Sequence, residues 1–260
     1  MKLHSSFFGD TQAGVAPLII LHGLFGTGRN WEGIARRMSA RRPVITLDLP
    51  NHGRSTWVAD IDYEGMARAV SGFLADQGIE RAVAMGHSMG GKTAMTLALI
   101  QPQLVTSLIV IDIAPVPYDH TNRHYIDALM NLPVDRIATR ADADAALMDD
   151  ISDPGLRAFL LTNLERSGNG FEWRINLEGL GECLSALLSF PASDKVDDYL
   201  GPALFVGGET SDYILPEHEM VIRQMFPNAR ITVVAGAGHW VHADKPEALL
   251  ATVEGFLDAV

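Results

Sequence analysis

Short apolar runs alternate with longer amphipathic stretches along this chain, and this alternation restricts the fold more than any other feature. The runs have four to six residues and many β-branched side chains, which is typical of parallel strands covered on both faces. The amphipathic stretches have the apolar spacing of helices that pack on one side. Together they predict an α/β fold with a doubly wound, mostly parallel sheet. The predicted strands are 17–21, 44–47, 82–86, 108–112, 203–206 and 231–234, and the predicted helices are 31–40, 63–77, 90–100, 216–226 and 246–259.

The alternation is interrupted once, between Asp112 and Ala203. About ninety residues there contain no convincing strand, and a structureless loop of this length is uncommon in a compact domain. We therefore expect a helical cap at 117–198, inserted into a core made of 1–116 and 199–260. Because it follows the carboxyl end of a strand, this cap would cover the crevice in which open α/β sheets bind ligands. Its predicted helices are 122–131, 141–151, 154–166 and 177–188.

Length, charge and cysteine content limit the class of protein and its partners. A chain of 260 residues can bury a large core without disulfides, and its single cysteine, Cys183, cannot form one internally. The net charge of −12 and the lack of a basic face predict no nucleic-acid partner. No apolar run approaches the ~18 residues of a membrane span, and the first residues do not resemble a secretory signal. We expect a soluble, cytoplasmic protein; the oligomeric state stays open.

The segment 82–91 has the pattern of a strand, then Gly86-His-Ser88-Met-Gly90, then a helix. A serine on such a tight turn takes strained backbone angles, and side chains in place of the two glycines would collide with neighbouring backbone. The turn would lift the Ser88 hydroxyl above the sheet, and the following helix would direct its N–H groups at an oxyanion formed there. This pattern predicts Ser88 as a nucleophile.

An oxyanion hole needs a second donor from a loop after an earlier strand. The strand before His22-Gly-Leu24-Phe-Gly26 supplies such a loop. We expect the backbone N–H groups of Leu24 and Met89 to converge on one oxygen. His22 precedes the nucleophile and belongs to this loop, so we expect it to hold the loop in shape by hydrogen bonding to backbone.

A serine nucleophile needs a base that titrates near neutral pH, and histidine is the natural candidate. On this type of fold the order along the chain is serine, acid, histidine. His239 lies on a glycine-rich loop after the last predicted strand, and His242 follows three residues later in an expected helical turn. This placement favours His239 as the base.

The acid must orient His239 and stabilise its imidazolium form. Asp112 ends one predicted strand, and Asp212 lies in the loop after the next one, with Glu209 as a weaker third choice. Both aspartates follow the carboxyl ends of neighbouring strands, so either could reach the ring. The residues alone leave Asp112 and Asp212 as alternatives.

Several of these motifs together resemble the α/β-hydrolase superfamily and, more narrowly, its small capped serine esterases of the YbfF type. The resemblance covers nearly the whole chain. It implies the α/β-hydrolase fold with a helical cap inserted after the sixth strand, ester hydrolysis, and Ser88 and His239 as nucleophile and base. It also implies Asp112 as the acid, although this sequence departs from the group by having Asp212 in a Gly-x-x-Ser-Asp pattern. The matching motifs are HGLFG at 22–26, DLPNHGRS at 48–55, GHSMGGK at 86–92, IDIAPV at 111–116, EWRIN at 172–176 and AGAGHWVHADKP at 235–246.

These residues predict hydrolysis of small-molecule esters of small to medium acyl chains through an acyl-enzyme, without metal or organic cofactor. Phe25, Met89, Trp173 and Trp240 are candidate walls of the substrate pocket. Lys92 lies in the first turn of a helix, where its charge opposes the helix dipole, so we expect it to have a carboxylate or backbone partner.

The sequence leaves alternative functions open. A thioesterase or acyltransferase would use the same triad, although the 15 acidic and 7 basic side chains of 119–198 disfavour the phosphates of an acyl-CoA. A perhydrolase, a C–C bond hydrolase and a non-catalytic ligand receptor are further alternatives. Dehalogenase and epoxide-hydrolase relatives need an aspartate where Ser88 stands.

Overall fold

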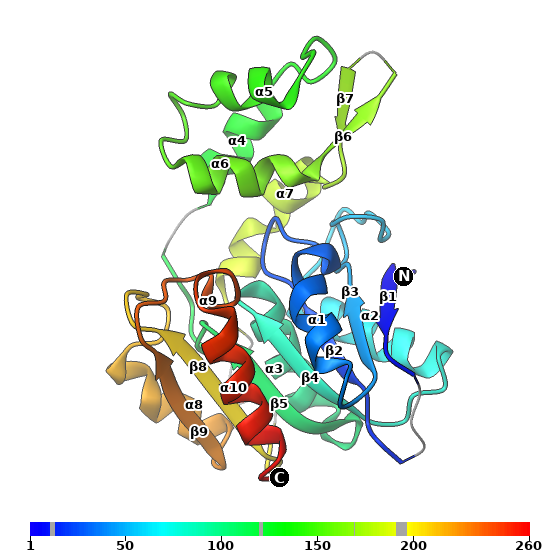
Figure 1. Ribbon diagram of the computed structural model, residues 1–260, viewed down its shortest axis with the longest axis vertical. Coiled ribbons are helices and arrows are strands. Elements are labelled where there is room, and N and C mark those ends of the chain that lie inside the picture. The colour runs from blue at the N-terminus through cyan, green and yellow to red at the C-terminus, as the bar shows by residue number, and fades with distance from the viewer. Residues whose placement is uncertain (11–13, 120–121, 169, 191–196) are drawn as a thin grey trace.

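The computed structural model describes residues 1–10, 14–119, 122–168, 170–190 and 197–260. Its centre is a seven-stranded sheet with the strand order β1-β3-β2-β4-β5-β8-β9 (Figure 1). Every neighbouring pair is parallel except β1 and β3. The strands are β1 (Ser5–Phe8), β2 (Leu18–Leu21), β3 (Val44–Leu47), β4 (Ala82–His87), β5 (Val105–Ile111), β8 (Ala203–Gly208) and β9 (Ala229–Val234).

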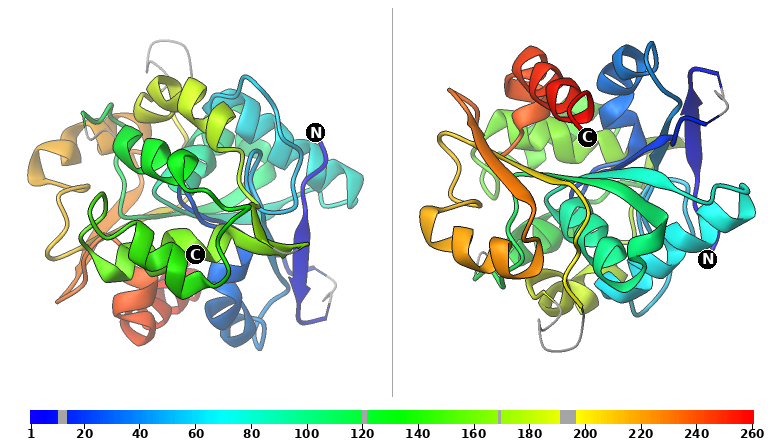
Figure 2. Two further views of the ribbon diagram at one scale, coloured as in Figure 1. Left: turned by 90° about the horizontal axis from the view of Figure 1, so that it is seen from above. Right: turned by 90° about the horizontal axis from the view of Figure 1, so that it is seen from below.

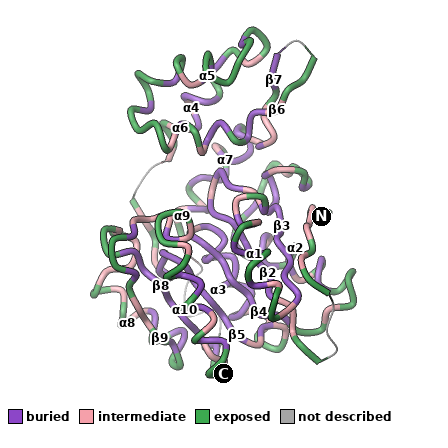
Figure 3. The backbone as a smooth tube through the Cα atoms, in the orientation of Figure 1, coloured by how far each residue is buried: buried purple, intermediate pink, exposed green. Residues whose placement is uncertain are grey.

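Helices cover both faces of this sheet. Helices α1 (Glu32–Met38) and α10 (Pro246–Leu257) pack on one face. Helices α2 (Tyr63–Asp76), α3 (Met89–Ile100) and α8 (Glu219–Met225) pack on the other. Alternate residues of each central strand contribute to the two cores, and Figure 3 shows these strands as a continuous buried layer. The predicted doubly wound α/β fold is confirmed.

The six predicted strands correspond to β2, β3, β4, β5, β8 and β9. The edge strand β1 was not predicted, because its four residues are mostly half-buried and lack the continuous apolar pattern of the central strands. It pairs antiparallel with β3, from Ser5 opposite Leu47 to Phe8 opposite Val44.

The insertion between β5 and β8 contains helices and a small hairpin. The expectation of no strand there was wrong, since β6 (Leu164–Ser167) and β7 (Gly170–Trp173) form an antiparallel pair. The predicted helix 154–166 ends early because a 3-10 turn (Leu161–Asn163) follows it and leads into β6. The helices are α4 (Arg123–Asn131), α5 (Arg140–Ala146), α6 (Pro154–Leu160) and α7 (Leu177–Leu188).

The insertion follows β5, the fifth described strand, and not a sixth, because only four described strands precede β5. Figure 1 shows α4–α6 and the hairpin gathered at one end of the molecule, with α7 between them and the sheet. Seen from above in Figure 2, these elements extend over the sheet. We keep 117–198 as the proposed limits of the cap, of which 120–121, 169 and 191–196 lie outside the described residues.

Among the helices of the described ranges, none is long and apolar enough to cross a membrane.

Candidate active site

Ser88 occupies the sharp turn between β4 and α3. Its backbone angles are φ 52° and ψ −118°, which lie outside the regions that L-residues ordinarily populate. A Cβ atom on Gly86 would lie 2.0 Å from the carbonyl oxygen of Gly90, and one on Gly90 would lie 2.3 Å from the carbonyl oxygen of Leu21. The two glycines are therefore required by close backbone approach, as the sequence predicted. Such a strained turn presents the serine side chain beyond the end of the strand.

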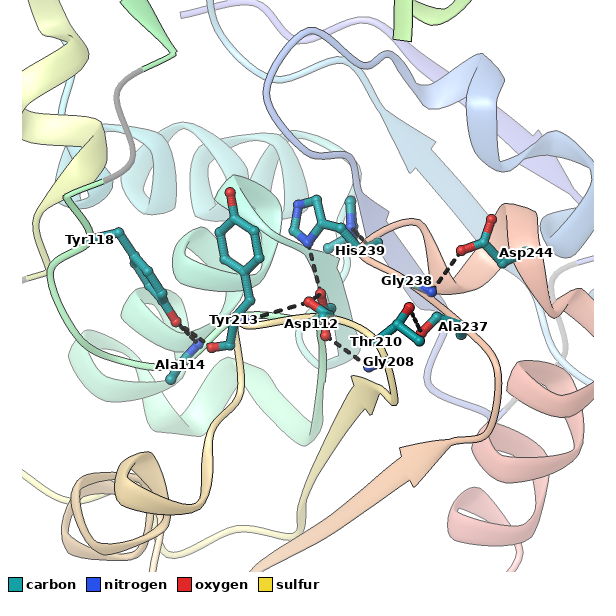
Figure 4. Close-up of polar contacts among 12 residues, drawn as sticks. Asp112, Ala114, Tyr118, Gly208, Thr210, Tyr213, Ala237, Gly238, His239 and Asp244 are labelled. Carbon is teal, nitrogen blue, oxygen red and sulfur yellow. Dashed lines mark hydrogen bonds and ion pairs between the residues drawn. The ribbon is translucent and has the colours of Figure 1, made fainter. Parts of the chain in front are cut away.

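His239 lies on the loop after β9 and hydrogen-bonds the carboxylate at the end of β5. Its Nδ1–H donates to Oδ2 of Asp112 over 2.8 Å. Asp112 is fully buried and also accepts a hydrogen bond from the backbone N–H of Gly208, at 2.8 Å, and one from the Ser211 hydroxyl. Figure 4 shows this group of residues meeting beyond the ends of the strands. The contact leaves Nε2 of His239 as the nitrogen available for proton transfer.

The other predicted acids lie elsewhere. Asp212 is exposed, and the carboxylate on His239 belongs to Asp112. Glu209 is also exposed, and its Oε2 accepts a hydrogen bond from the backbone N–H of Gly236 at 2.7 Å. The arrangement thus places one of the two predicted aspartates in contact with the predicted base.

His242, the rival base, packs against Trp31 with ring centroids 4.1 Å apart. Burial lowers its pKa to about 4. Its Nδ1 has no hydrogen-bond partner among the described residues, so no carboxylate orients this ring.

Further residues position His239 and were missed in the sequence. The Tyr213 ring stacks on the imidazole of His239, with centroids 4.0 Å apart. The Tyr118 hydroxyl donates to the carbonyl oxygen of Tyr213 at 2.5 Å and accepts from the N–H of Ala114 at 2.9 Å (Figure 4). The only sequence signal for Tyr213 was its place in the loop after β8, beside Asp212.

His87 also holds the loop that carries His239. Its Nε2–H donates to the carbonyl oxygen of His239 at 2.8 Å. Burial lowers the pKa of His87 well below its usual range, so the ring is neutral. It acts on the backbone of the His239 loop and not on the imidazole nitrogens.

The loop that follows β2 is held in shape by two neutral histidines. His22 donates from Nδ1 to the carbonyl oxygen of Gly23 at 2.8 Å and accepts from the N–H of Leu49 at 2.9 Å. His52 accepts from the N–H of Phe25 at 3.3 Å. Burial lowers the pKa of His22 to about 4 and that of His52 to about 3. His22 therefore makes the backbone hydrogen bonds expected of it.

The insertion also holds this loop. Nδ2 of Asn163 donates to the carbonyl oxygen of Phe25 at 2.7 Å, and both residues are buried. Within the described part of the chain, the backbone N–H groups of Leu24 and Met89 donate no hydrogen bond. These two groups are thus available to a ligand oxygen.

A cavity of about 220 Å³ lies over these residues. Its lining includes Ser88 and His239, together with the predicted wall residues Phe25 and Trp240. Met89 lines a second, smaller cavity instead. Trp173 lines neither, because it is the last residue of β7 and pairs with Leu164 in the hairpin. The insertion contributes other wall residues, namely Asn122, Tyr125, Leu156 and Phe159.

Lys92 is buried in the first turns of α3 and has the backbone partners that its position requires. Its Nζ donates to the carbonyl oxygens of Leu188 at 3.1 Å and Ser189 at 2.6 Å, at the end of α7. Within the described ranges, no group of three or more His, Cys, Asp or Glu side chains could hold a metal ion.

The sheet, the strained serine turn and the loop positions are those of a hydrolase built on a doubly wound sheet. The model of the alpha/beta hydrolase family matches residues 18–252. Because this match spans most of the chain, the protein belongs to the alpha/beta hydrolase family.

Similar proteins include named lipases and esterases. The chain is 41% identical over 257 residues to the sn-1-specific diacylglycerol lipase ABHD11 of Mus musculus, covering 95% of this chain and 83% of that protein. It is 35% identical to esterase YbfF of Escherichia coli (strain K12), covering 94% and 93% of the two chains. Among solved structures, a marine microorganism esterase is 36% identical, with a TM-score of 0.93 and coverage of 98% and 99%.

Proposed function

We propose that this protein is a serine hydrolase that cleaves carboxylic esters of small to medium acyl chains through an acyl-enzyme on Ser88. One observation carries the proposal: Ser88, on its strained turn, lines the same cavity as His239, whose Nδ1 hydrogen-bonds the buried carboxylate of Asp112. The similarity to an esterase and a lipase along nearly the whole chain supports the same reaction. No hydrogen bond joins Ser88 to His239 among the described residues, so we propose that this contact forms when substrate binds.

In this mechanism His239 removes the Ser88 proton through Nε2 while Oγ attacks the ester carbonyl. Asp112 holds the imidazole in the required tautomer and stabilises the imidazolium. The N–H groups of Leu24 and Met89 bind the oxyanion; removal of one such donor typically costs about 100- to 1000-fold in rate.

His239 then protonates the departing alcohol, and the acyl group remains on Ser88. Water attacks the acyl-enzyme with His239 again as base, which releases the acid and restores the serine. In this account Asp112 is the acid of the triad, and Asp212 has no part in proton transfer.

The decisive test is Ser88→Ala. We expect p-nitrophenyl acetate turnover to fall on the order of 10⁶-fold, as for other serine nucleophiles, while circular dichroism shows an unchanged fold. Activity retained in this variant would refute the nucleophile assignment.

The alternative acyl transfer and thioester reactions use the same residues, so the substrate must separate them. Turnover of a series of esters and CoA thioesters of equal acyl length, with and without a competing alcohol, distinguishes hydrolysis from transfer. We expect free acid from esters as the main product. A protein that binds these compounds without turnover would instead be a ligand receptor on the same scaffold.

A further inference from the structure

Two cavities meet at Ser88. The larger one, described above, has His239 in its lining, whereas the smaller one, of about 40 Å³, does not. Leu24, Ser88, Asn122 and Tyr213 line both. A substrate attached to Ser88 would therefore place its two halves in different cavities.

The direction of proton transfer determines which half goes where. In the tetrahedral intermediate the departing alcohol must lie beside the imidazolium that protonates it. His239 borders only the larger cavity, so the alcohol leaves on that side. The acyl substituent then points into the smaller cavity, whose volume corresponds to about three water-sized groups.

The smaller cavity has an apolar part, formed by Met89, Ile113, Leu184, Leu187 and Leu188, but it also contains a buried cation. Lys92 lines it and is only 1% exposed. Its ammonium group lies 5.5 Å from the centre of the Tyr63 ring and 4.8 Å from that of Tyr118, which stabilises positive charge.

No carboxylate forms an ion pair with Lys92 among the described residues. Burial accordingly lowers its pKa to about 7. Two of its three N–H donors are used by the carbonyl oxygens of Leu188 and Ser189. The N-terminus of the twelve-residue helix α3 adds positive potential at the same place. A buried ammonium in this setting would gain strongly from an anionic partner.

We infer that the smaller cavity binds the acyl group and that Lys92 selects acyl groups ending in a carboxylate. The preferred substrates are half-esters of short dicarboxylic acids, in which two methylene groups and the carboxylate fill the cavity. This inference rests on the proposed ester hydrolysis and specifies its substrate class.

The test compares two esters of equal shape. Ethyl hydrogen succinate carries the carboxylate, and ethyl 4-methylpentanoate carries an isopropyl group in its place. We expect wild type to favour the succinate in kcat/KM on the order of 100-fold, as for a charge-assisted hydrogen bond, and Lys92→Met to lose this preference. Released ethanol is measured for both substrates.

Tyr63→Phe is the matched control for a structural role of Lys92. The Tyr63 hydroxyl donates to the carbonyl oxygen of Leu187 at 2.6 Å, so this variant weakens the attachment of the same end of α7 without changing charge. Tyr63→Phe should change kcat/KM for both substrates by the same factor and leave the ratio of the two values unaltered. If the ratio is the same in wild type and Lys92→Met, Lys92 only fixes α7 and the inference is wrong.

Wild type alone also tests the inference if Lys92→Met does not fold. The 2-carboxyethyl ester of 4-methylpentanoic acid carries the carboxylate in its alcohol half. Its kcat/KM should not exceed that of ethyl 4-methylpentanoate. Preference for that ester, or for the neutral ethyl ester, would overturn the inference while leaving ester hydrolysis intact. No turnover of any of these esters would instead count against the proposed function itself.

Discussion

The core and the insertion contribute different things to the same cavity. Ser88, Asp112 and His239 all lie at the ends of core strands, in loops fixed by buried hydrogen bonds. The insertion contributes wall residues such as Tyr125 and Phe159, and the single buried amide of Asn163 that holds the loop after β2. In the proposed function, the core carries the chemistry and the insertion adjusts which substrates reach it. Changes in the core should therefore reduce kcat, and changes in the insertion should alter KM or selectivity.

The strongest test of the core compares its two candidate acids. Asp112→Asn should lower kcat about 10⁴-fold, because the imidazole loses its orienting carboxylate. Asp212→Asn should change kcat by less than about threefold, since Asp112 is the partner of His239. Steady-state hydrolysis of a short aryl ester measures both. Equal mild losses would mean that neither aspartate is essential.

The buried histidines of the core predict a loss of stability in acid. His22 and His52 have folded-state pKa values of about 4 and about 3, below the ordinary value of 6.5. As pH falls, the unfolded chain takes up these protons first. The contribution of the two histidines to the free energy of unfolding is therefore complete above pH 6.5 and is lost as the pH falls to about 4 for His22 and about 3 for His52. Each histidine should lower the free energy of unfolding by about 1.4 kcal/mol per pH unit in that window.

Urea denaturation from pH 7 to pH 4 measures this loss. The free energy of unfolding of His52→Gln should depend less steeply on pH than that of wild type, because one of the buried neutral histidines is missing. If the free energy of unfolding falls equally steeply with pH in both proteins, His52 does not contribute to the loss of stability in acid.

The contact between Tyr213 and His239 should matter less than the carboxylate. Tyr213→Leu removes the stacked ring but leaves the hydrogen bond to Asp112. We expect kcat to fall about 10- to 100-fold with a smaller change in KM, because the imidazole is less well positioned. A large increase in KM at constant kcat would mean that Tyr213 binds substrate instead.

The insertion should show the smallest effect on catalysis. Phe159 lines the larger cavity and lies 6.0 Å from the Trp240 ring, measured between centroids. Phe159→Ala should raise KM for an aryl ester about 10-fold, a loss of apolar contact, and change kcat less. Trp173→Ala is the control, since Trp173 lines neither cavity and should leave KM within about twofold. If Phe159→Ala lowered kcat as much as Tyr213→Leu does, the proposed division of roles between core and insertion would be wrong.

The sequence predicted the core better than the insertion for a physical reason. Parallel strands buried on both faces need continuous apolar runs, and these identified every central strand. The strands of the hairpin are partly exposed and carry mixed side chains, so the start of β6 was assigned to the predicted helix 154–166 and β7 was not predicted.

In the candidate site, too, some features could be predicted from the sequence and others could not. Ser88, His239 and the loop at Leu24 were predicted because backbone geometry requires glycines around them. The partner of His239, its stacking on Tyr213 and the absence of Trp173 from the cavity depend on how distant loops meet. That information lies in the packing and not in any local pattern.

Covalent labelling with a fluorophosphonate tests the central claim most directly, since such probes react preferentially with an activated serine. Peptide mass spectrometry should place a single adduct on Ser88 in wild type. The same adduct should form on the order of 10⁴-fold more slowly in His239→Ala. An adduct on another residue, or equal labelling rates in the two proteins, would contradict the account.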